Sequence, residues 1–314
     1  MTKILLLGKG GQVGWELQRS LSPLGELIAL DHDSTDFCGN FANLSGLADT
    51  VRAIRPDLIV NAAAHTAVDK AESEPELART LNALAPQVLA QEAAQLGAWL
   101  LHYSTDYVFD GSGDTPRLET DTTGPLSVYG ATKLEGEQLI AAANPRHLIF
   151  RTSWVYAARG GNFAKTMLRL AQERDKLTVI NDQIGAPTGA DLLADVTAHV
   201  LRQLTQSKSD ARSSKATPGS ANADALAGLY HLVASGETNW FAYAKHVLAQ
   251  AQLIQPALHI TAKQVDPVPT SAFPTPAQRP LNSRLDTRKL QAAFALQLPD
   301  WHLGVERALS EMLG

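Results

Sequence analysis

The sequence predicts an α/β protein with a Rossmann-type, doubly wound parallel sheet and a smaller C-terminal substrate-binding domain. The first observation is a strand-like apolar run at 3–7, followed at once by a glycine-rich turn and a helical pattern at 15–21. The second is that apolar runs at 27–30, 57–61 and 99–103 alternate with helical stretches. Strands that alternate with helices along a chain are typical of a parallel sheet with helices on both faces.

Three glycines, Gly8, Gly11 and Gly14, follow the first strand. Glycines in such a turn allow a tight bend, let the backbone approach a pyrophosphate, and let helix and strand pack closely. The phosphates would lie at the N-terminus of the helix, where backbone N–H groups and the helix dipole favour an anion. The alternative is an ordinary strand-to-helix loop without a ligand.

Asp31 ends the second strand, 23 residues after Gly8. A carboxylate there can accept hydrogen bonds from the adenosine ribose hydroxyls, and it repels a 2′-phosphate, which favours NADH. No arginine follows closely, but a solvent-facing acid can turn away, so the choice between NADPH and NADH stays open. The alternative role for Asp31 is to cap a helix or turn.

Small residues at 62–64 follow the third strand, and Thr105 follows the fourth. The carboxyl ends of parallel strands lie at one edge of the sheet, where doubly wound folds bind their ligands. The glycine turn, Asp31, the alanine run and Thr105 should therefore converge on one cleft.

Tyr129 and Lys133 are four residues apart in a helical stretch, so they should share one face of a helix. A phenol has a pKa of about 10, and a nearby ammonium lowers that pKa by favouring the ionised form. The pair suits proton donation to a carbonyl that is being reduced, and the Thr105 hydroxyl can bond the same carbonyl. The alternative is a chance pair on an exposed helix.

Taken together in this order, the glycine spacing, the run at 61–63, Thr105 and the Tyr129–Lys133 pair resemble the extended short-chain dehydrogenase/reductase family. Within it, segments from both halves of the chain resemble the dTDP-4-dehydrorhamnose reductases. The resemblance implies reduction of dTDP-4-dehydro-β-L-rhamnose to dTDP-L-rhamnose by hydride from NADPH or NADH. This would be the last step of dTDP-rhamnose biosynthesis, which supplies cell-surface polysaccharides such as the lipopolysaccharide O-antigen.

The resemblance also implies roles for individual residues. Tyr129 would protonate the developing alkoxide, Lys133 would hold the nicotinamide ribose and lower the tyrosine pKa, and Thr105 would steer the carbonyl. Besides Tyr129 and Lys133, the implied cofactor contacts are Gly8, Gly11, Gln12, Val13, Asp31, Asn40, Phe41, Ala63, Ala64, Thr66 and Tyr103. Asn40 departs from the family, which often has an acid at this position. An amide can still bond adenine, so the departure affects the expected affinity for the cofactor more than the expected reaction.

Thr105, Asp106 and Trp154 correspond to positions that face the sugar in the family. Trp154 can stack on the sugar or form a wall beside it. The alternative is that Trp154 is buried in the core or at the domain junction. Arg279 or Arg284, in and just after a proline-rich loop at 267–280, can pair with the nucleotide diphosphate. The alternative for each arginine is a salt bridge that ties the domains together.

Two other functions share much of this pattern. Related 4,6-dehydratases carry Asp-Glu after the threonine, whereas Asp106-Tyr107 follows Thr105 here, which favours simple reduction. A 4-epimerase needs almost the same triad of threonine, tyrosine and lysine, so it remains a second possibility. A non-catalytic regulatory subunit could keep the nucleotide-binding fold, but it has no physical need for a hydroxyl, phenol and ammonium around one carbonyl.

The domain organisation follows from the same pattern. An NAD(P)-binding domain is expected over 1–152, and the segments 188–204 and 228–234 are expected to return to it. The remainder of 153–314 should form mainly the substrate-binding domain. The segment 205–225 is polar and lacks an apolar period, which predicts a flexible surface insertion.

The composition is that of an ordinary soluble protein. The 314 residues have a net charge of −5 and a hydrophobic fraction of 45%, so no basic surplus indicates nucleic acid as a partner. The N-terminal apolar run is too short for a signal peptide or a membrane span, so we expect a cytoplasmic protein with no membrane partner. The resemblance implies a small-molecule nucleotide-sugar substrate. A single cysteine, Cys38, excludes an internal disulfide.

The resemblance is compatible with a homodimer, although the sequence does not settle the oligomeric state. Glu16 and Asp191 occupy positions that resemble a magnesium-linked dimer contact in some relatives. Because two acids without a defined geometry are more often solvated surface groups, Mg²⁺ is the weaker interpretation, and no metal is assigned to the active site.

Overall fold

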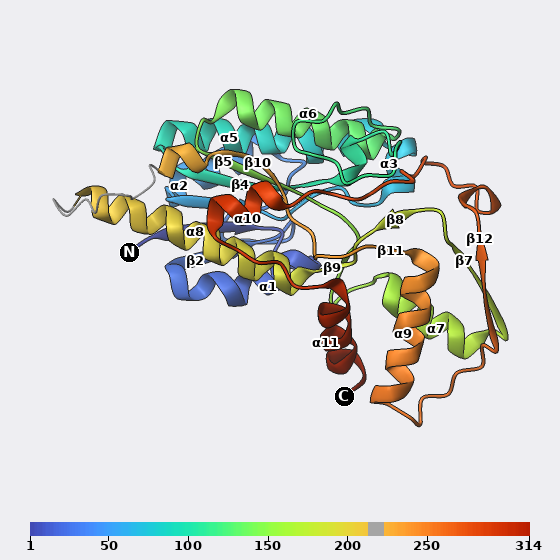
Figure 1. Cartoon of the computed structure of the whole chain (residues 1–314). Coiled ribbons are helices and arrows are strands. Elements are labelled where there is room, and N and C mark those ends of the chain that lie inside the picture. Colours follow the sequence, from blue (N-terminus) through green and yellow to red (C-terminus); the bar gives the residue numbers. More distant parts are fainter. Residues whose placement is uncertain (213–222) are drawn as a thin grey trace.

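A parallel sheet of six strands forms the centre of the computed structural model, which describes residues 1–212 and 223–314 (Figure 1). The strand order is β10-β5-β4-β3-β1-β2, and every neighbouring pair is parallel. The strands are β1 (Lys3–Leu7), β2 (Glu26–Leu30), β3 (Leu58–Asn61), β4 (Trp99–Thr105), β5 (His147–Thr152) and β10 (Gly228–His231). The predicted fold class is confirmed.

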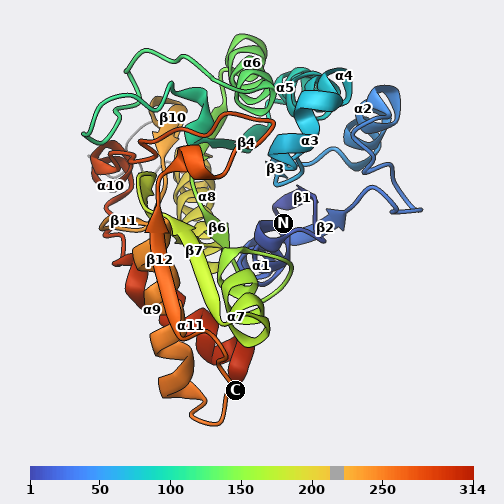
Figure 2. The same ribbon diagram turned by 90° about the vertical axis from the view of Figure 1, so that its right-hand side faces the viewer.

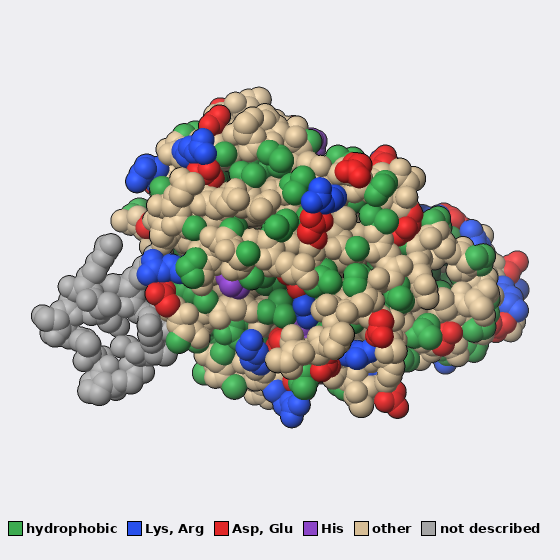
Figure 3. Space-filling model, turned by 90° about the horizontal axis from the view of Figure 1, so that it is seen from above, with side chains coloured by type: hydrophobic (Ala, Val, Ile, Leu, Met, Phe, Trp, Pro, Cys, Tyr) green, Lys and Arg blue, Asp and Glu red, His purple; other side chains and the backbone are tan. Residues whose placement is uncertain are grey.

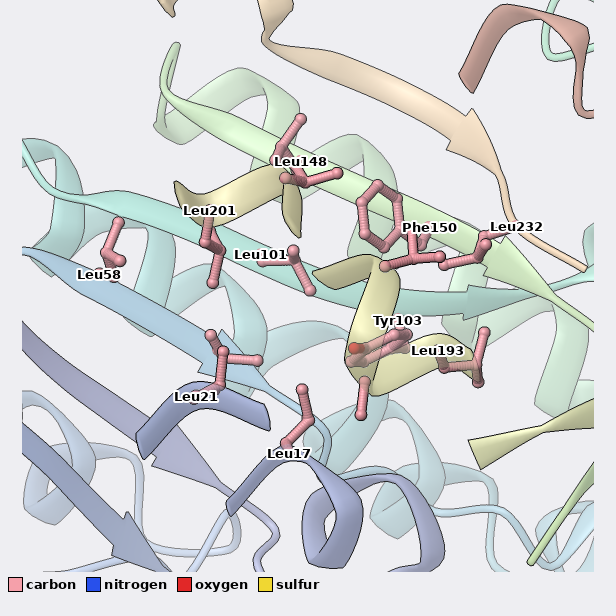
Figure 4. Close-up of a cluster of buried hydrophobic side chains, with 14 of the residues drawn as sticks. Leu17, Leu21, Leu58, Leu101, Tyr103, Leu148, Phe150, Leu193, Leu201 and Leu232 are labelled. Carbon is pink, nitrogen blue, oxygen red and sulfur yellow. The ribbon is translucent and has the colours of Figure 1, made fainter. Parts of the chain in front are cut away.

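Helices cover both faces of this sheet. One face carries α1 (Gln12–Leu21), α8 (Ala190–Arg212) and α10 (Arg288–Phe294), and the other carries α2 (Leu44–Ile54), α5 (Ala85–Leu96) and α6 (Val128–Ala143). Alternate strand residues point to opposite faces, so β1 contributes Ile4 and Leu6 to one core and Leu5 and Leu7 to the other. Figure 4 shows the first core, where Leu17, Leu21, Leu193 and Leu201 of α1 and α8 meet the strands.

The second part of the chain builds a smaller unit around its own core. It contains α7 (Phe163–Glu173), α9 (Trp240–Ile254) and α11 (Trp301–Leu313), with β7 (Lys176–Ile180) paired to β12 (Gln264–Val268) (Figure 2). Asparagine side chains start two of these helices: Asn162 Oδ1 accepts from Lys165 N at 3.1 Å and Asn239 Oδ1 accepts from Ala242 N at 2.8 Å.

Short elements complete the chain. Two small pairings, of β6 (Val155–Tyr156) with β9 (Thr188–Gly189) and of β8 (Ile184–Gly185) with β11 (Thr238–Asn239), lie where the two units meet. The remaining helices are α3 (Val68–Ser73) and α4 (Pro75–Arg79), and the short 3-10 helices cover Ser22–Leu24, Asp106–Val108, Ala223–Leu226 and Thr270–Ala272.

One helix begins earlier than predicted, and another has the interruption that its proline predicts. α1 begins at Gln12, three residues before the expected start, because Gly11 has the extended backbone of an N-cap. The helical stretch 75–96 is expected to be interrupted near Pro86, and a π-helical turn at Thr80–Leu84 interrupts it just before that proline. Proline has no N–H to bond the carbonyl four residues earlier, that of Asn82. This carbonyl instead lies against Gly136 of α6, where a Cβ atom would overlap it.

Two segments also differ near the surface. The flexible insertion expected over 205–225 is in part helical, because α8 continues to Arg212 and a 3-10 helix begins at Ala223, while 213–222 lie outside the described residues. The loop expected over 267–280 begins as strand, since Pro267 and Val268 belong to β12. Among the described strands β12 pairs with β7 alone, and such an edge position tolerates a proline.

The surface carries charges of both signs. On the face seen in Figure 3, basic and acidic side chains are interspersed and do not gather into one basic stripe. No helix within 1–212 and 223–314 has the length and apolar character needed to cross a membrane.

The glycine turn gives a test of the packing between β1 and α1. A Cβ atom on Gly14 would overlap the backbone carbonyl oxygen of Gly8, whereas a Cβ on Gly11 would lie 3.5 Å from the same oxygen, an ordinary contact. We expect Gly14→Ala to lower the free energy of unfolding by about 1–3 kcal/mol. Gly11→Ala, the matched control, should lower it by less than about 1 kcal/mol. Urea denaturation measures both, and equal losses would contradict this account.

Candidate active site

A cleft of about 1080 Å³ opens at the carboxyl edge of the sheet, between the sheet and the smaller unit. The residues expected to contact cofactor or substrate line it, except Arg284: they are Gly8, Gly11, Gln12, Val13, Asp31, Asn40, Phe41, Ala63, Ala64, Thr66, Tyr103, Thr105, Asp106, Tyr129, Lys133, Trp154 and Arg279. The parallel strands bring these distant segments together because their carboxyl ends share one edge.

The glycine turn forms one end of the cleft. Gly8 has a φ of +86°, which favours glycine, and a Cβ there would lie 2.7 Å from Ala63 N of the neighbouring loop. Gly11 is the N-cap of α1, and Gln12 and Val13 form its first turn. The first N–H groups of a helix have no partner within the helix, so this turn can hold an anion.

Asp31 supports the glycine turn. Its Oδ2 accepts a hydrogen bond from Gly10 N at 2.9 Å, and its Oδ1 accepts from His32 N at 2.9 Å. Burial raises the pKa of this carboxyl, but the hydrogen bonds from His32 and Gly10 outweigh it and hold the pKa below its usual value. The carboxylate therefore bonds the turn itself while it lines the cleft.

The rest of this wall is small or apolar. Asn40 Oδ1 accepts from Ala42 N at 2.9 Å, and Phe41 is packed into the core beside β1 and β2. Ala63 N donates to Asn61 Oδ1 at 3.0 Å, which fixes the loop after β3. Such a wall leaves room for a flat group to lie against the backbone.

Tyr129 lies in the first turn of α6, opposite the end of β4. Ser127 Oγ caps this helix by accepting from Gly130 N at 3.2 Å. The ring of Tyr107 packs edge-on against the Tyr129 ring, with centroids 5.5 Å apart. Burial raises the pKa of Tyr129 to about 12, and its interaction with the Thr105 side chain opposes this rise.

Lys133 is buried and turned toward strand β4. Its Nζ donates to the Tyr103 carbonyl oxygen at 2.6 Å and lies 3.0 Å from His102 Nε2. Burial lowers the pKa of Lys133 to about 7. In this arrangement Nζ bonds groups of β4, and burial leaves the pKa of Tyr129 raised where the sequence predicted a lowered one.

Strand β4 divides its side chains between the two faces of the sheet. The Tyr103 hydroxyl reaches α8, where it lies 2.6 Å from Thr197 Oγ1, and Figure 4 shows its ring in the core beside Leu193. Its carbonyl group is thus the part that contacts Lys133. Thr105 ends the strand and donates from Oγ1 to Asp106 Oδ1 at 3.1 Å.

Asp106 and two tryptophans line a further part of the cleft. Burial raises the pKa of Asp106 to about 6, although its interactions with the Ser283 and Thr105 side chains oppose this rise. Within the described residues its buried Oδ2 atom has no hydrogen-bond partner of good geometry. Trp154 stacks on Trp240, with ring centroids 3.7 Å apart and planes at 18°. No motif in the sequence marks Trp240 as a cleft residue, since it lies only just after Asn239, the N-cap of α9.

The structure separates the two candidate arginines. Arg279 lines the cleft, where its Nη2 donates to Asp69 Oδ2 at 2.7 Å and its buried Nη1 has no partner among the described residues. Arg284 pairs with Glu237 at 2.6 Å and does not line the cleft. Arg279 is thus the arginine with a donor available to an anion in the cleft.

The two acids considered for magnesium lie apart from this chemistry. Glu16 pairs with Arg19 at 3.4 Å, and Asp191 lies 3.6 Å from Arg307. Across 1–212 and 223–314, the one group of three or more clustered metal-ligand side chains is Asp31, His32 and Asp33, which includes neither acid. The geometry gives Mg²⁺ no support at Glu16 and Asp191.

Comparison with known proteins places the chain in a family. The sequence model of the family described as "RmlD substrate binding domain" matches residues 1–313. The dTDP-4-dehydrorhamnose reductase of Escherichia coli K12 is 59% identical over 309 residues, covering 98% of this chain and 97% of that protein. The Salmonella typhimurium enzyme of the same name is 60% identical over 309 residues, with the same coverage.

A solved structure agrees with these matches. The dTDP-4-dehydrorhamnose reductase of Bacillus anthracis, in complex with NADP, is 34% identical and has a TM-score of 0.83 over 99% of this chain and 100% of that one. The chain therefore belongs to the RmlD substrate-binding-domain family, together with these dTDP-4-dehydrorhamnose reductases.

Proposed function

We propose that this protein reduces the 4-keto group of dTDP-4-dehydro-β-L-rhamnose to give dTDP-L-rhamnose. The observation that carries the proposal is the meeting of Thr105, Tyr129 and Lys133 in one cleft beside a glycine turn suited to a dinucleotide. Family membership supports the choice of substrate, because the relatives that match almost the whole chain are named for this reaction.

The cofactor site is proposed along the glycine turn. Gly11, Gln12 and Val13 would hold the pyrophosphate at the start of α1, and Asp31 would face the adenosine ribose. A bound NADPH or NADH supplies the hydride. The Bacillus anthracis relative was solved with NADP, which supports a nicotinamide cofactor for this chain.

The proton is proposed to come from Tyr129. C4 gains the hydride, and the carbonyl oxygen, held by the Thr105 hydroxyl, gains the phenolic proton to become an alcohol. A pKa of about 12 keeps Tyr129 protonated at neutral pH, so the phenol is ready to donate. A Lys133 ammonium turned toward the ribose would stabilise the tyrosinate that remains.

The substrate is proposed to lie across the cleft from Asp106 to Arg279. Asp106 Oδ2 and Arg279 Nη1 are buried polar atoms without partners in the described part of the chain. An acceptor and a donor left in this way suit a sugar hydroxyl and a diphosphate oxygen, respectively. The face of Trp154 would wall the sugar ring.

A direct assay tests the function. Purified protein, dTDP-4-dehydro-L-rhamnose and either NADPH or NADH are followed at the absorbance band of the reduced nicotinamide. We expect oxidation that depends on the sugar nucleotide, and the two cofactors are ranked side by side. Protein that binds a reduced cofactor but never oxidises it with this substrate would contradict the proposal.

Removing one hydroxyl tests the acid. Tyr129→Phe deletes the proton donor with little change in volume, so kcat should fall about 100- to 10,000-fold. Binding of NADPH, followed by fluorescence titration, should stay close to that of the wild type. Tyr243→Phe, which removes a hydroxyl from a tyrosine outside the cleft, is the matched control. Near-normal turnover by Tyr129→Phe would exclude it as the acid.

The diphosphate contact is tested by a pair of arginine variants. Arg279→Gln should raise KM for the nucleotide sugar about tenfold to a hundredfold, because a hydrogen bond to a charged group contributes about 1.5–3 kcal/mol. Arg284→Gln, the control, removes a guanidinium that pairs with Glu237 outside the cleft. If only the control raised KM, the assignment of Arg279 would be wrong.

A further inference from the structure

His102 is a buried histidine that the proposed mechanism does not use, and it lies directly behind Lys133. It belongs to β4 and has no exposed surface. The strand register places it opposite Asn61 of β3, and its Nδ1 lies 2.9 Å from Asn61 Nδ2. On the other side, its Nε2 lies 3.0 Å from Lys133 Nζ.

The backbone fixes the orientation of the Asn61 amide. Asn61 Oδ1 accepts from Ala63 N at 3.0 Å, and a backbone N–H can only donate. The amide nitrogen must therefore face His102 and donate to its Nδ1. A neutral imidazole that accepts at Nδ1 carries its proton on Nε2.

This proton determines the state of Lys133. The His102 Nε2–H points at Nζ, and an ammonium has only donors, so two donors would oppose each other. A neutral amine has one lone pair that accepts from His102, and it can still donate to the Tyr103 carbonyl oxygen at 2.6 Å. We propose that Asn61 and His102 are positioning residues that hold Lys133 as a neutral amine in this arrangement.

The charged groups around Lys133 are compatible with this state. Glu137, one turn further along α6, is the acid that favours the ammonium, but Arg151 of β5 binds both of its oxygens, at 2.9 and 2.6 Å. Tyr129 is the titratable group on the cleft side, and burial keeps it protonated. Burial lowers the pKa of His102 well below its usual value, which keeps the ring neutral.

The consequence for turnover rests on the proposed function. Lys133 must bind a proton from solvent before an ammonium can stabilise the Tyr129 tyrosinate. Raising the pH through the pKa of Lys133, about 7, removes that ammonium, so kcat/KM should fall as pH rises above this range. The tautomer of His102 is measured without turnover, so it is tested independently of the reaction.

The experiment is nitrogen NMR of the full-length protein labelled with ¹⁵N in its histidine rings. The His102 signals are assigned by their loss in His102→Gln, or by their shift in Asn61→Asp if the first variant does not fold. We expect a neutral ring protonated at Nε2 at pH 7. A ring protonated at Nδ1, or an imidazolium at that pH, would overturn the proposal.

A variant of the same shape tests the link to Lys133. Asn61→Asp keeps the acceptor for Ala63 N but replaces the amide donor that faces His102 with a second acceptor. The His102 ring should then carry its proton on Nδ1 and accept from a Lys133 ammonium at Nε2. The pKa of Lys133 should therefore rise, and the pH at which kcat/KM falls should move upward by about one unit. Asn144→Asp makes the same swap at a buried asparagine that bonds Ala98 and Arg146, and it should change neither readout. An Asn61→Asp protein with the wild-type tautomer and pH profile would contradict the proposal.

Discussion

The register between the parallel strands is the constraint on which the site depends. It pairs Asn61 with His102 across β3 and β4, and Thr105 with Thr152 across β4 and β5. Because strand side chains alternate between faces, a shift of one residue would turn His102 toward α8 and Tyr103 toward α6. Lys133 finds its carbonyl and imidazole partners only in the register that is present.

Much of the fold and the site could be predicted because the signals are local. The strand and glycine pattern at 3–14 is contiguous, Tyr129 and Lys133 share a helix, and Thr105 ends its strand. Each signal depends on residues a few positions apart, and the parallel sheet then gathers them at one edge.

The rest depends on contacts between distant segments. The direction of the Lys133 side chain is set by β4, the stacking of Trp154 depends on Trp240, and the π turn at 80–84 accommodates the close approach of α6. A periodicity within one segment contains no information about these partners. The separation of Arg279 from Arg284 likewise appears only when their acids, Asp69 and Glu237, are placed in space.

Trp154 is one of three described residues other than glycine with a positive φ, at +50°. Such a backbone costs a bulky side chain about 1–3 kcal/mol, and glycine would remove that cost. Selection for stability alone would therefore favour glycine at this position. Trp154 instead places an indole there, which stacks on Trp240 and forms part of the cleft wall, so at residue 154 a thermostabilising mutation would alter the shape of the cleft.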